Sequence, residues 1–262
     1  MIPFPILSSY ENRLLAISTT REGGISTGNY ASMNLCHYVG DNPEHVAENR
    51  RIFCKINQIN SDKIIFPRQT HNNQIIHIDT AFFQKTERNQ QKLLYGKDAI
   101  ITQERNVCIG ISTADCVPVL LYDRQKQAIG AVHAGWRGTV ARIVSQTVHL
   151  MTKTFGSHPA DIIAVIAPCI SKENYEVGDE LYEIFKDAFF PTGILFSKNP
   201  ETKKYHLDLR AANNWLLTDE AEIPQNNIYI SDLCTFANAD KLFSARKFGI
   251  NSGRIASCMM LK

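Results

Sequence analysis

Short apolar runs rich in Ile and Val recur along the chain, and each is bounded by Gly, Pro, Asn or Asp. Runs of this length and composition predict β-strands. The predicted strands are residues 99–102, 107–112, 117–122, 128–133, 162–167, 228–231 and 254–261. Some neighbouring strands are too close in sequence to be joined by a crossover helix, so a purely parallel sheet is not expected.

Segments with helical periodicity are interleaved with these strands. The clearest series repeats at i, i+3, i+4, i+7, i+8 and i+11 and consists of Val140, Ile143, Val144, Thr147, Val148 and Met151. It predicts one helix that starts near Gly138. Three more helices are predicted at Pro43–Ile56, at Leu181–Ala188 and after Asp208, whose side chain can cap a helix start.

This order of elements predicts an α+β (mixed α/β) fold, with a mixed sheet and helices outside it. The Pro- and Lys-rich stretch Pro191–Lys204 is expected to be an exposed loop. It is not expected to link two domains, because the segments on both sides read as packed elements. We therefore expect a single domain over residues 1–262. Neither GxGxxG nor a Walker A loop is present, so the usual nucleotide-binding loops are absent from the sequence.

Composition narrows the function classes. The chain has 262 residues, of which 44% are hydrophobic and 21% charged, with a net charge of +2. Since no dense Lys/Arg block occurs, neither nucleic acid nor an anionic membrane is expected as a partner, and no protein partner is inferred. The N-terminal residues lack the pattern of a signal peptide, and no apolar run approaches the length of a membrane span. Seven scattered cysteines without a CxxC pair favour reduced thiols and a cytoplasmic location.

The stretch STADCVPVLLYD, residues 112–123, places Cys116 beside Asp115 where a predicted strand begins. Two interpretations are open. Asp115 can form a turn while Cys116 fills the core, because free cysteine is among the most buried residue types. Alternatively, Cys116 is a thiolate held at a strand end for chemistry.

The stretch AVHAGWRGT, residues 131–139, ends a predicted strand at His133 and starts a helix near Gly138. The first N–H groups of a helix lack intrahelical partners, so a helix start beside Arg137 can hold an anion. The alternative is a Gly-rich turn in which Trp136 packs and Arg137 is solvated.

Two histidines lie in residues 64–79. His77 alternates with isoleucines and fits the polar face of a strand, whereas His71 lies in a polar turn from which it can reach a cleft. His71, Cys116 and His133 each lie where an apolar strand meets a turn. Imidazole nitrogen and thiolate sulfur are preferred zinc donors, and three protein ligands leave the fourth position open, as in catalytic zinc sites.

A second constellation needs no metal. Cys116 can be a nucleophile activated by His133 or His71, with Asp115 orienting the histidine. Neighbouring side chains of an extended backbone point apart, so capping or support of the site suits Asp115 better than direct contact with Cys116.

Several motifs resemble the YfiH-like proteins, also called the laccase-domain or multicopper polyphenol oxidase family, which is related to FAMIN. The most specific are TADC and HAGWRG. The matching segments, in family order, are TREGGIS (20–26), SMNL (32–35), GDNPEHVAENR (40–50), QTHNNQI (69–75), DAIIT (98–102), STADCVPVLLYD (112–123), AVHAGWRGT (131–139), IAPCISKENYEVGDE (166–180), DLCT (232–235) and FSARKFGINSGRIAS (243–257).

The resemblance implies an α/β sandwich of mixed sheets with a surface pocket, and a zinc site at His71, Cys116 and His133, which are also the catalytic candidates. It further implies phosphorolysis of adenosine, inosine and methylthioadenosine, and deamination of adenosine. The older family name implies copper-dependent oxidation of phenols. The chain departs from the family pattern at Thr70, Asn72, Ala167 and Ala245, and the last departure puts a substrate contact at that position in doubt.

The histidine content bears on the copper interpretation. A multicopper cluster of the kind that the laccase name implies needs about ten histidines, several as His-x-His pairs, because imidazole is the favoured copper ligand. The chain has eight histidines and no His-x-His pair. One Cys-His-His site can still bind copper adventitiously, since copper outranks zinc in intrinsic affinity.

The leading hypothesis is a zinc-dependent enzyme that acts on purine nucleosides, with phosphate as co-substrate. Arg137, Arg21 and Arg246 are candidates for binding phosphate, and Tyr175, Asn34 and Asp115 are candidates for lining the pocket. Tyr175 can equally be a packing residue and Asp115 a cap. The alternatives are a copper-dependent polyphenol oxidase, a Cys-His hydrolase of amides or cell-wall precursors, and a non-enzymatic protein whose metal only stabilises the fold.

Overall fold

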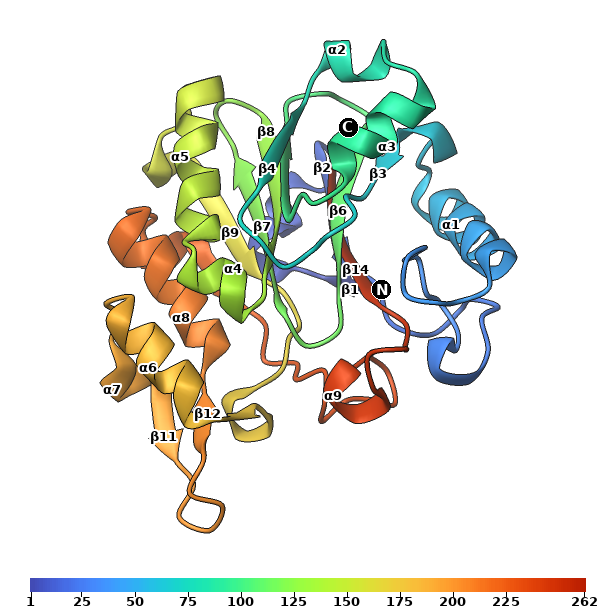
Figure 1. The fold of residues 1–262 in the computed structure, drawn as a ribbon. Coiled ribbons are helices and arrows are strands. Elements are labelled where there is room, and N and C mark those ends of the chain that lie inside the picture. The colour runs from blue at the N-terminus through green and yellow to red at the C-terminus, as the bar shows by residue number, and fades with distance from the viewer.

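Two β-sheets packed face to face form the centre of the molecule in the computed structural model, which describes all residues 1–262 (Figure 1). The larger sheet has six strands in the order β13-β9-β7-β8-β5-β4. In that order its strands are Ile228–Ile230, Ile162–Ile166, Val117–Asp123, Ala128–Ala134, Ala99–Thr102 and Ile75–Ile78. It mixes antiparallel pairs at its centre with the parallel pairs β4·β5 and β9·β13.

The second sheet has five strands in the order β1-β2-β14-β6-β3. In that order its strands are Ile2–Pro3, Leu14–Ser18, Ile255–Leu261, Cys108–Thr113 and Ile64–Ile65. The strand β14, at the end of the chain, pairs with β2 and β6 and so joins the N-terminal strands to the middle of the sequence.

Alternation along β7 explains the layers. Leu120 and Tyr122 pack into the cluster between the two sheets, while Val119 and Leu121 pack against the helices on the opposite face. All four side chains are fully buried. Successive strand residues point to opposite faces, so a continuously apolar strand must be covered on both sides.

Helices form the outer layers. The helix α1 (Pro43–Asn57) covers the five-stranded sheet, where Phe53 packs against its outer face. The other sheet is covered by α5 (Ile143–Phe155) and α8 (Leu209–Trp215), which α4 (Trp136–Val140) adjoins. Figure 1 shows the resulting order of helix, sheet, sheet and helix across the molecule. The helices lack the length and the apolar character that a membrane span requires.

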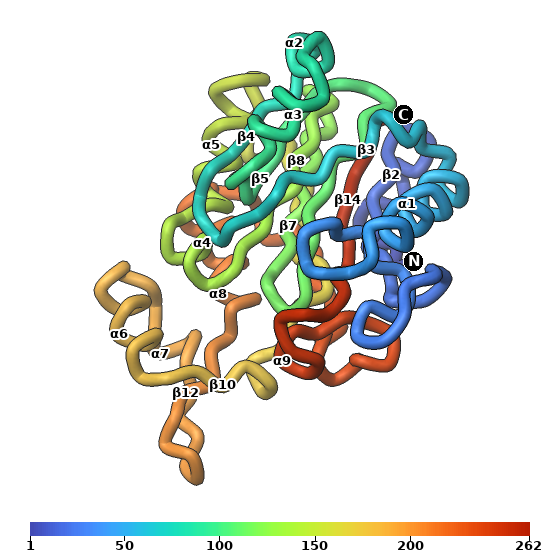
Figure 2. The backbone as a smooth tube through the Cα atoms, turned by 45° about the vertical axis from the view of Figure 1, so that its right-hand side comes forward, coloured from blue at the N-terminus to red at the C-terminus, as the bar shows by residue number.

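Smaller elements surround the sandwich. A three-stranded sheet with α6 (Asp179–Asp187) and α7 (Thr192–Leu195) projects from one end, as Figure 2 shows. Its strands, in sheet order, are β10 (Glu176–Val177), β12 (Tyr205–Leu207) and β11 (Phe196–Lys198). The remaining short helices are α2 (Thr80–Phe83), α3 (Glu87–Leu94) and α9 (Ala245–Phe248).

The mixed fold expected from the sequence is confirmed. All seven predicted strands are present, and their boundaries move by no more than one residue. The four predicted helical regions are also helical. His77 lies on the exposed side of β4, as its alternation with isoleucines predicted.

Two details of the prediction are wrong. The helix expected to run unbroken from Gly138 is divided into α4 and α5, because Arg142 between them adopts a left-handed conformation with φ +62°. The side chain of Arg142 is held there by an ion pair with Glu220 at 2.7 Å and a hydrogen bond to the carbonyl of Ala188 at 2.6 Å.

The segment Pro191–Lys204 is not wholly an exposed loop. It contains α7 and β11, and both Leu195 and Phe196 are buried in the cluster under the helices. The longest exposed run of the segment is residues 200–204, in the turn after β11, which has the character that the Pro and Lys residues indicated.

Candidate metal centre and pocket

Three potential zinc ligands meet at one edge of the six-stranded sheet. Cys116 directly precedes β7, and His133 lies in β8 opposite Pro118, so the antiparallel pairing of β7 and β8 brings Cys116 and His133 together. His71 comes from the loop between β3 and β4. One donor atom from each of the three residues lies within 4.8 Å of the other two. These donors are therefore close enough to share one ion after small side-chain adjustments.

The buried carboxylate of Asp98, one residue before β5, orients His133. Its Oδ1 lies 2.6 Å from Nδ1 of His133, and neither side chain has more than 3% exposure. Burial opposes ionisation, but hydrogen bonding and charge from His133, with N–H donors from the His71 loop, lower the pKa of Asp98. An ionised Asp98 accepts a proton donated by Nδ1, which leaves Nε2 of His133 free to bind a metal.

Asp98 also holds the loop that carries His71. Backbone N–H groups of Thr70, His71 and Asn72 donate to its two oxygens at 3.0–3.1 Å. His71 itself has φ +63°, a left-handed conformation that is uncommon outside glycine. The three N–H bonds to one carboxylate account for the stability of this strained turn.

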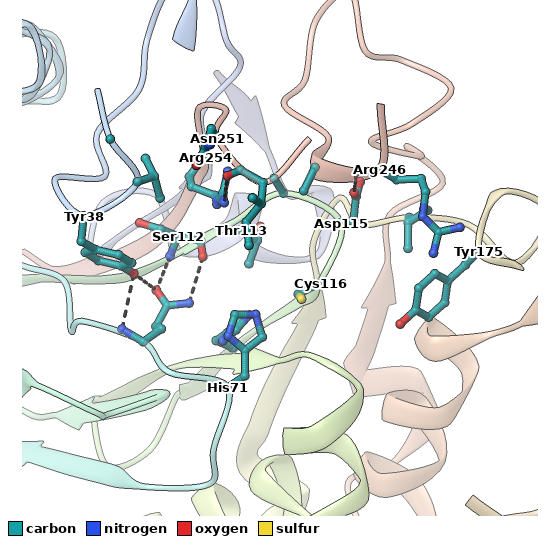
Figure 3. Close-up of a pocket in the computed structure, with 18 residues that line it drawn as sticks. Tyr38, His71, Ser112, Thr113, Asp115, Cys116, Tyr175, Arg246, Asn251 and Arg254 are labelled. Carbon is teal, nitrogen blue, oxygen red and sulfur yellow. Dashed lines mark hydrogen bonds between the residues drawn. The ribbon is translucent and has the colours of Figure 1, made fainter. Parts of the chain in front are cut away.

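Gln69 fixes the same loop to the five-stranded sheet. Its Oε1 accepts the N–H of Ser112 at 2.8 Å, and its Nε2 donates to the carbonyl of Ser112 at 2.9 Å. The hydroxyl of Tyr38 donates to Gln69 Oε1 at 3.2 Å. Figure 3 shows this network on one side of His71. The loop that carries His71 is thus bonded to Asp98, beside the six-stranded sheet, and to Ser112 of the five-stranded sheet.

Gly135 leaves room beside the three donors. A Cβ atom at this position would lie 3.1 Å from the sulfur of Cys116 and 3.3 Å from Cδ2 of His71. A side chain here would crowd the donors, so glycine suits a bound ion. The set of one thiolate and two imidazoles, with Asp98 behind His133, fits zinc chemistry.

Charges in the site couple Cys116 to His133. Burial alone would raise the pKa of Cys116, but the charge of His133 and hydrogen bonds from His133 and His71 lower it to about 6. Burial alone would lower the pKa of His133, but the charge of Cys116 and the bond to Asp98 raise it to about 9. The metal-free site therefore holds a thiolate beside an imidazolium at neutral pH, and metal binding must displace the proton of His133.

The three donors line a pocket of about 820 Å³. Its walls come from both sheets and from the segment around α9. The lining residues are Tyr38, Val39, Gly40, Gln69, His71, Ser112, Thr113, Ala114, Asp115, Cys116, His133, Ile170, Tyr175, Ala245, Arg246, Ile250, Asn251 and Arg254.

Asp115 lies at the pocket wall, but its side chain is bonded to the protein. Its Oδ1 accepts the hydroxyl proton of Thr235 at 2.6 Å, and its Oδ2 accepts the N–H of Arg246 at 2.7 Å. The residue has φ +94°, and its carbonyl accepts the N–H of Ile170 at 3.0 Å. Asp115 therefore shapes the turn that presents Cys116.

Tyr175 and Arg246 form another part of the wall. The guanidinium of Arg246 lies over the Tyr175 ring, 5.3 Å from its centroid, and donates one bond to the carbonyl of Glu176. Figure 3 shows the Tyr175 hydroxyl on the side of the ring that faces Cys116. Burial and the negative charge of Cys116 raise the pKa of Tyr175, so its hydroxyl stays protonated as a donor.

Three sequence candidates lie outside the pocket lining. Arg21 donates to the carbonyls of Ala31 and Ala239, with its guanidinium near the rings of Phe243 and Phe248. Asn34 is fully buried and accepts the N–H of Arg254. Arg137 is exposed and stacks on its neighbour Trp136. Arg21, Asn34 and Arg137 are therefore not among the lining residues, although Arg137 is near enough to Tyr175 for its charge to act on that hydroxyl.

Other residues of the site were not singled out from the sequence. Asp98, Tyr38, Gln69 and Arg254 all belong to it or support it. The one available signal was an acid directly before the buried strand AIIT, because a carboxylate in that place has to find partners. The contacts of these four residues join segments that are far apart in the chain, so the local sequence pattern does not reveal them.

The fold and site define a class of α/β sandwich with a Cys-His-His edge pocket. The model of the family described as multi-copper polyphenol oxidoreductase laccase matches residues 15–262, and the chain belongs to this family. A solved structure titled Bacillus licheniformis hypothetical protein YfiH superposes with a TM-score of 0.89 at 31% identity, covering 96% of this chain and 94% of that one. The structure of YlmD from Geobacillus stearothermophilus superposes with a TM-score of 0.89 at 28% identity, covering 99% of this chain and 94% of that one.

Two relatives carry names that describe an activity. A Bacteroides thetaiotaomicron protein named purine nucleoside phosphorylase is 42% identical over 262 residues, which is all of this chain and 96% of the relative. Adenosine deaminase RL5, from an unknown prokaryotic organism, is 40% identical over 239 residues, or 91% of this chain and 90% of the relative.

Replacing Asp98 by Asn should weaken zinc binding by about tenfold to a hundredfold, because an amide no longer supplies the charge behind His133. Competition with a chromophoric chelator measures this. Asp123→Asn is the control, since Asp123 is equally buried but bonds only to its own turn. Equal zinc affinity of Asp98→Asn and the unchanged protein would contradict the role of Asp98.

Alkylation of metal-free protein should show a midpoint near the Cys116 pKa of about 6. Only the thiolate reacts, so the rate should stay high at neutral pH and fall as the solution becomes more acidic than the midpoint. Iodoacetamide kinetics, with the labelled peptide identified by mass spectrometry, measure it. Bound zinc should protect Cys116. A midpoint near the ordinary thiol value of about 8.5 would contradict the thiolate–imidazolium pair.

Proposed function

We propose that this protein is a zinc-dependent enzyme of purine nucleosides that cleaves adenosine, inosine or methylthioadenosine with phosphate and also deaminates adenosine. The observation that carries the proposal is a Cys-His-His donor set with an open side, exposed to a pocket of about 820 Å³. The names of the two relatives support a nucleoside as the substrate. We take residues 1–262 to form one catalytic domain.

The roles follow from the placement of the residues. His71, Cys116 and His133 would hold the ion, which when bound supplies a Lewis acid and a water of lowered pKa. Asp98 keeps His133 in the ligating tautomer. The pocket is large enough for a nucleoside beside a phosphate ion, since ligand pockets generally measure about 300–1,000 Å³.

Arg246 is the strongest of the proposed phosphate ligands. Arg254 also lines the pocket, but its guanidinium is committed to the carbonyls of Ile250, Ser252 and Gly253. Arg246 makes a single side-chain hydrogen bond, to the carbonyl of Glu176, and lies over the ring of Tyr175, whose hydroxyl stays protonated. Together the two side chains can donate hydrogen bonds to phosphate oxygens within the same pocket as the three metal ligands.

Copper-dependent phenol oxidation has weaker support. The site offers a single group of three donors, whereas a multicopper cluster needs many histidines. A Cys-His hydrolase is favoured by one observation, the proximity of Cys116 to His133, which lowers the pKa of the thiol and raises the pKa of the imidazole. Zinc bound to the same sulfur would remove that nucleophile, so metal content separates the two functions.

Protein purified without added metal should contain about one zinc per chain and consume adenosine and inosine, since the donor set is a complete three-ligand site. Metal analysis and chromatography of the products measure this. Phosphate should yield ribose 1-phosphate in place of free ribose. Cys116→Ala should lose both zinc and turnover, whereas Cys54→Ala, on the buried face of α1 and away from the pocket, should keep both. Turnover by metal-free protein that a thiol alkylator abolishes would favour the hydrolase.

Arg246→Met should raise the KM for phosphate about tenfold to a hundredfold, the loss expected for a charged hydrogen bond of about 1.5–3 kcal/mol. Adenosine deamination needs no phosphate, so its rate should change little and serves as the internal control. Arg137→Met is the matched variant, because Arg137 is exposed outside the pocket. A larger effect of Arg137→Met would place phosphate at the start of α4 instead.

A further inference from the structure

Two cysteines outside the metal centre are adjacent at the ends of neighbouring strands. Cys169 follows β9 and Cys234 follows β13, and the two residues are register partners in an isolated parallel bridge. Adjacent strands lie about 4.8 Å apart. This spacing falls within the Cα separation of about 4.4–6.8 Å that disulfides span.

Cys234 has the surroundings of a stabilised thiolate. Its sulfur accepts the backbone N–H groups of Ser171 at 3.3 Å and Ala237 at 3.5 Å, and the side-chain amide of Asn174 at 3.5 Å. Burial would raise the pKa of Cys234, but these donors lower it. The residue retains 6% exposure, whereas Cys169 has none.

The guanidinium of Arg210, on α8, lies close enough to the two thiols for its charge to act on them. Nε and Nη2 of Arg210 are buried and unpaired. Its charge acts on Cys169 and Cys234, and it opposes the burial that raises the pKa of Cys169 to about 11. Buried N–H groups without partners are costly and call for an explanation. A thiolate that forms during a reaction at Cys169 would supply the missing partner.

A second cysteine pair in the same protein lacks these features. Cys108 and Cys258 lie on β6 and β14 in the core beside α1, and both are fully buried. Hydrogen bonding to Cys258 and burial raise the pKa of Cys108 well above its ordinary value. Thiols in such apolar surroundings are inert, so this pair is an internal comparison.

We propose that Cys169 and Cys234 form an oxidisable dithiol that hydrogen peroxide converts to a disulfide. The Cys234 thiolate attacks one peroxide oxygen, the O–O bond breaks, and a sulfenic acid and hydroxide result. Cys169 then gives up its proton and attacks the Cys234 sulfur, so that the S–S bond forms, the S–O bond breaks and water leaves. Two thiols are oxidised and one peroxide is reduced to two waters.

The disulfide would act on the turn that carries Cys116. Ile170, next to Cys169, donates its N–H to the carbonyl of Asp115, and Thr235, next to Cys234, donates its hydroxyl proton to Asp115. Forming the bond draws the Cys234 sulfur away from its three N–H donors and displaces both neighbours. We expect the oxidised protein to hold zinc about tenfold more weakly, the scale of effects from groups that support ligands.

Zinc-loaded full-length protein treated with hydrogen peroxide, then blocked with an alkylator and digested, tests the proposal by mass spectrometry. A peptide linking Cys169 to Cys234 is expected in the unchanged protein and in Cys258→Ala, and not in Cys169→Ala. In Cys169→Ala, Cys234 should stop at a sulfenic acid that a dimedone probe captures. A linked Cys108–Cys258 peptide, or both Cys169 and Cys234 recovered unoxidised, would overturn the proposal.

Arg210→Met should slow disulfide formation by about tenfold, because the forming thiolate loses its counter-charge. Arg124→Met, at a surface ion pair, should leave the rate unchanged. Chelator competition on reduced and oxidised protein measures the effect on zinc. If reduced and oxidised protein bind zinc with equal affinity, the disulfide does not act through the Asp115 turn. If Arg210→Met is oxidised as fast as the unchanged protein, Arg210 has no role in disulfide formation.

Discussion

The buried carboxylate of Asp98 is the interaction on which the site depends. It receives four donors, namely Nδ1 of His133 and three consecutive N–H groups of the His71 loop, while its own carbonyl accepts the N–H of His133. A buried charge without such partners would be strongly destabilising. The same bonds that stabilise the carboxylate therefore set the tautomer of one histidine and the position of the other. Removing them would affect the fold of the loop and the geometry of the donors together.

The sandwich places this cluster where the two sheets open at one edge. Ser112 and Thr113 at the end of β6 face the pocket from one sheet, and Cys116 and His133 face it from the other. Strand ends are rigid because their backbones are paired, whereas the turns beyond them are free to carry polar side chains. This combination gives a small, stiff donor set and a much larger cavity beside it. The cavity has room for substrate groups that the donors do not touch.

The seven cysteines show how environment separates one side chain into different chemistries. Cys116 is partly exposed and paired with His133, Cys234 is nearly buried but receives N–H donors, and Cys108 lies among apolar groups. The thiolate is stabilised in the first two settings and disfavoured in the third. Proximity of two sulfurs is thus a poor guide to reactivity, because the donors and charges around them decide which thiol ionises.

The order and type of most elements follow from the sequence alone. Strands buried on both faces are read from continuous Ile and Val runs, and the donor types at their ends are visible as His71, Cys116 and His133. The local sequence pattern gives a wrong prediction where a contact with a distant segment decides the conformation or burial of a residue. Leu195 and Phe196 are drawn into the core from a segment rich in Pro and Lys, and Arg142 breaks a helix because Glu220 and Ala188 hold it.

Only the tertiary structure decided which polar residues support the site. Asp98 is 35 residues from His133 in sequence, and Arg21 and Asn34 turn out to bond to the protein and not to face the pocket. Burial patterns are local and are written in the spacing of apolar side chains. Hydrogen bonds between segments far apart in the chain have no such periodic signal, because their partners become neighbours only when the strands pair.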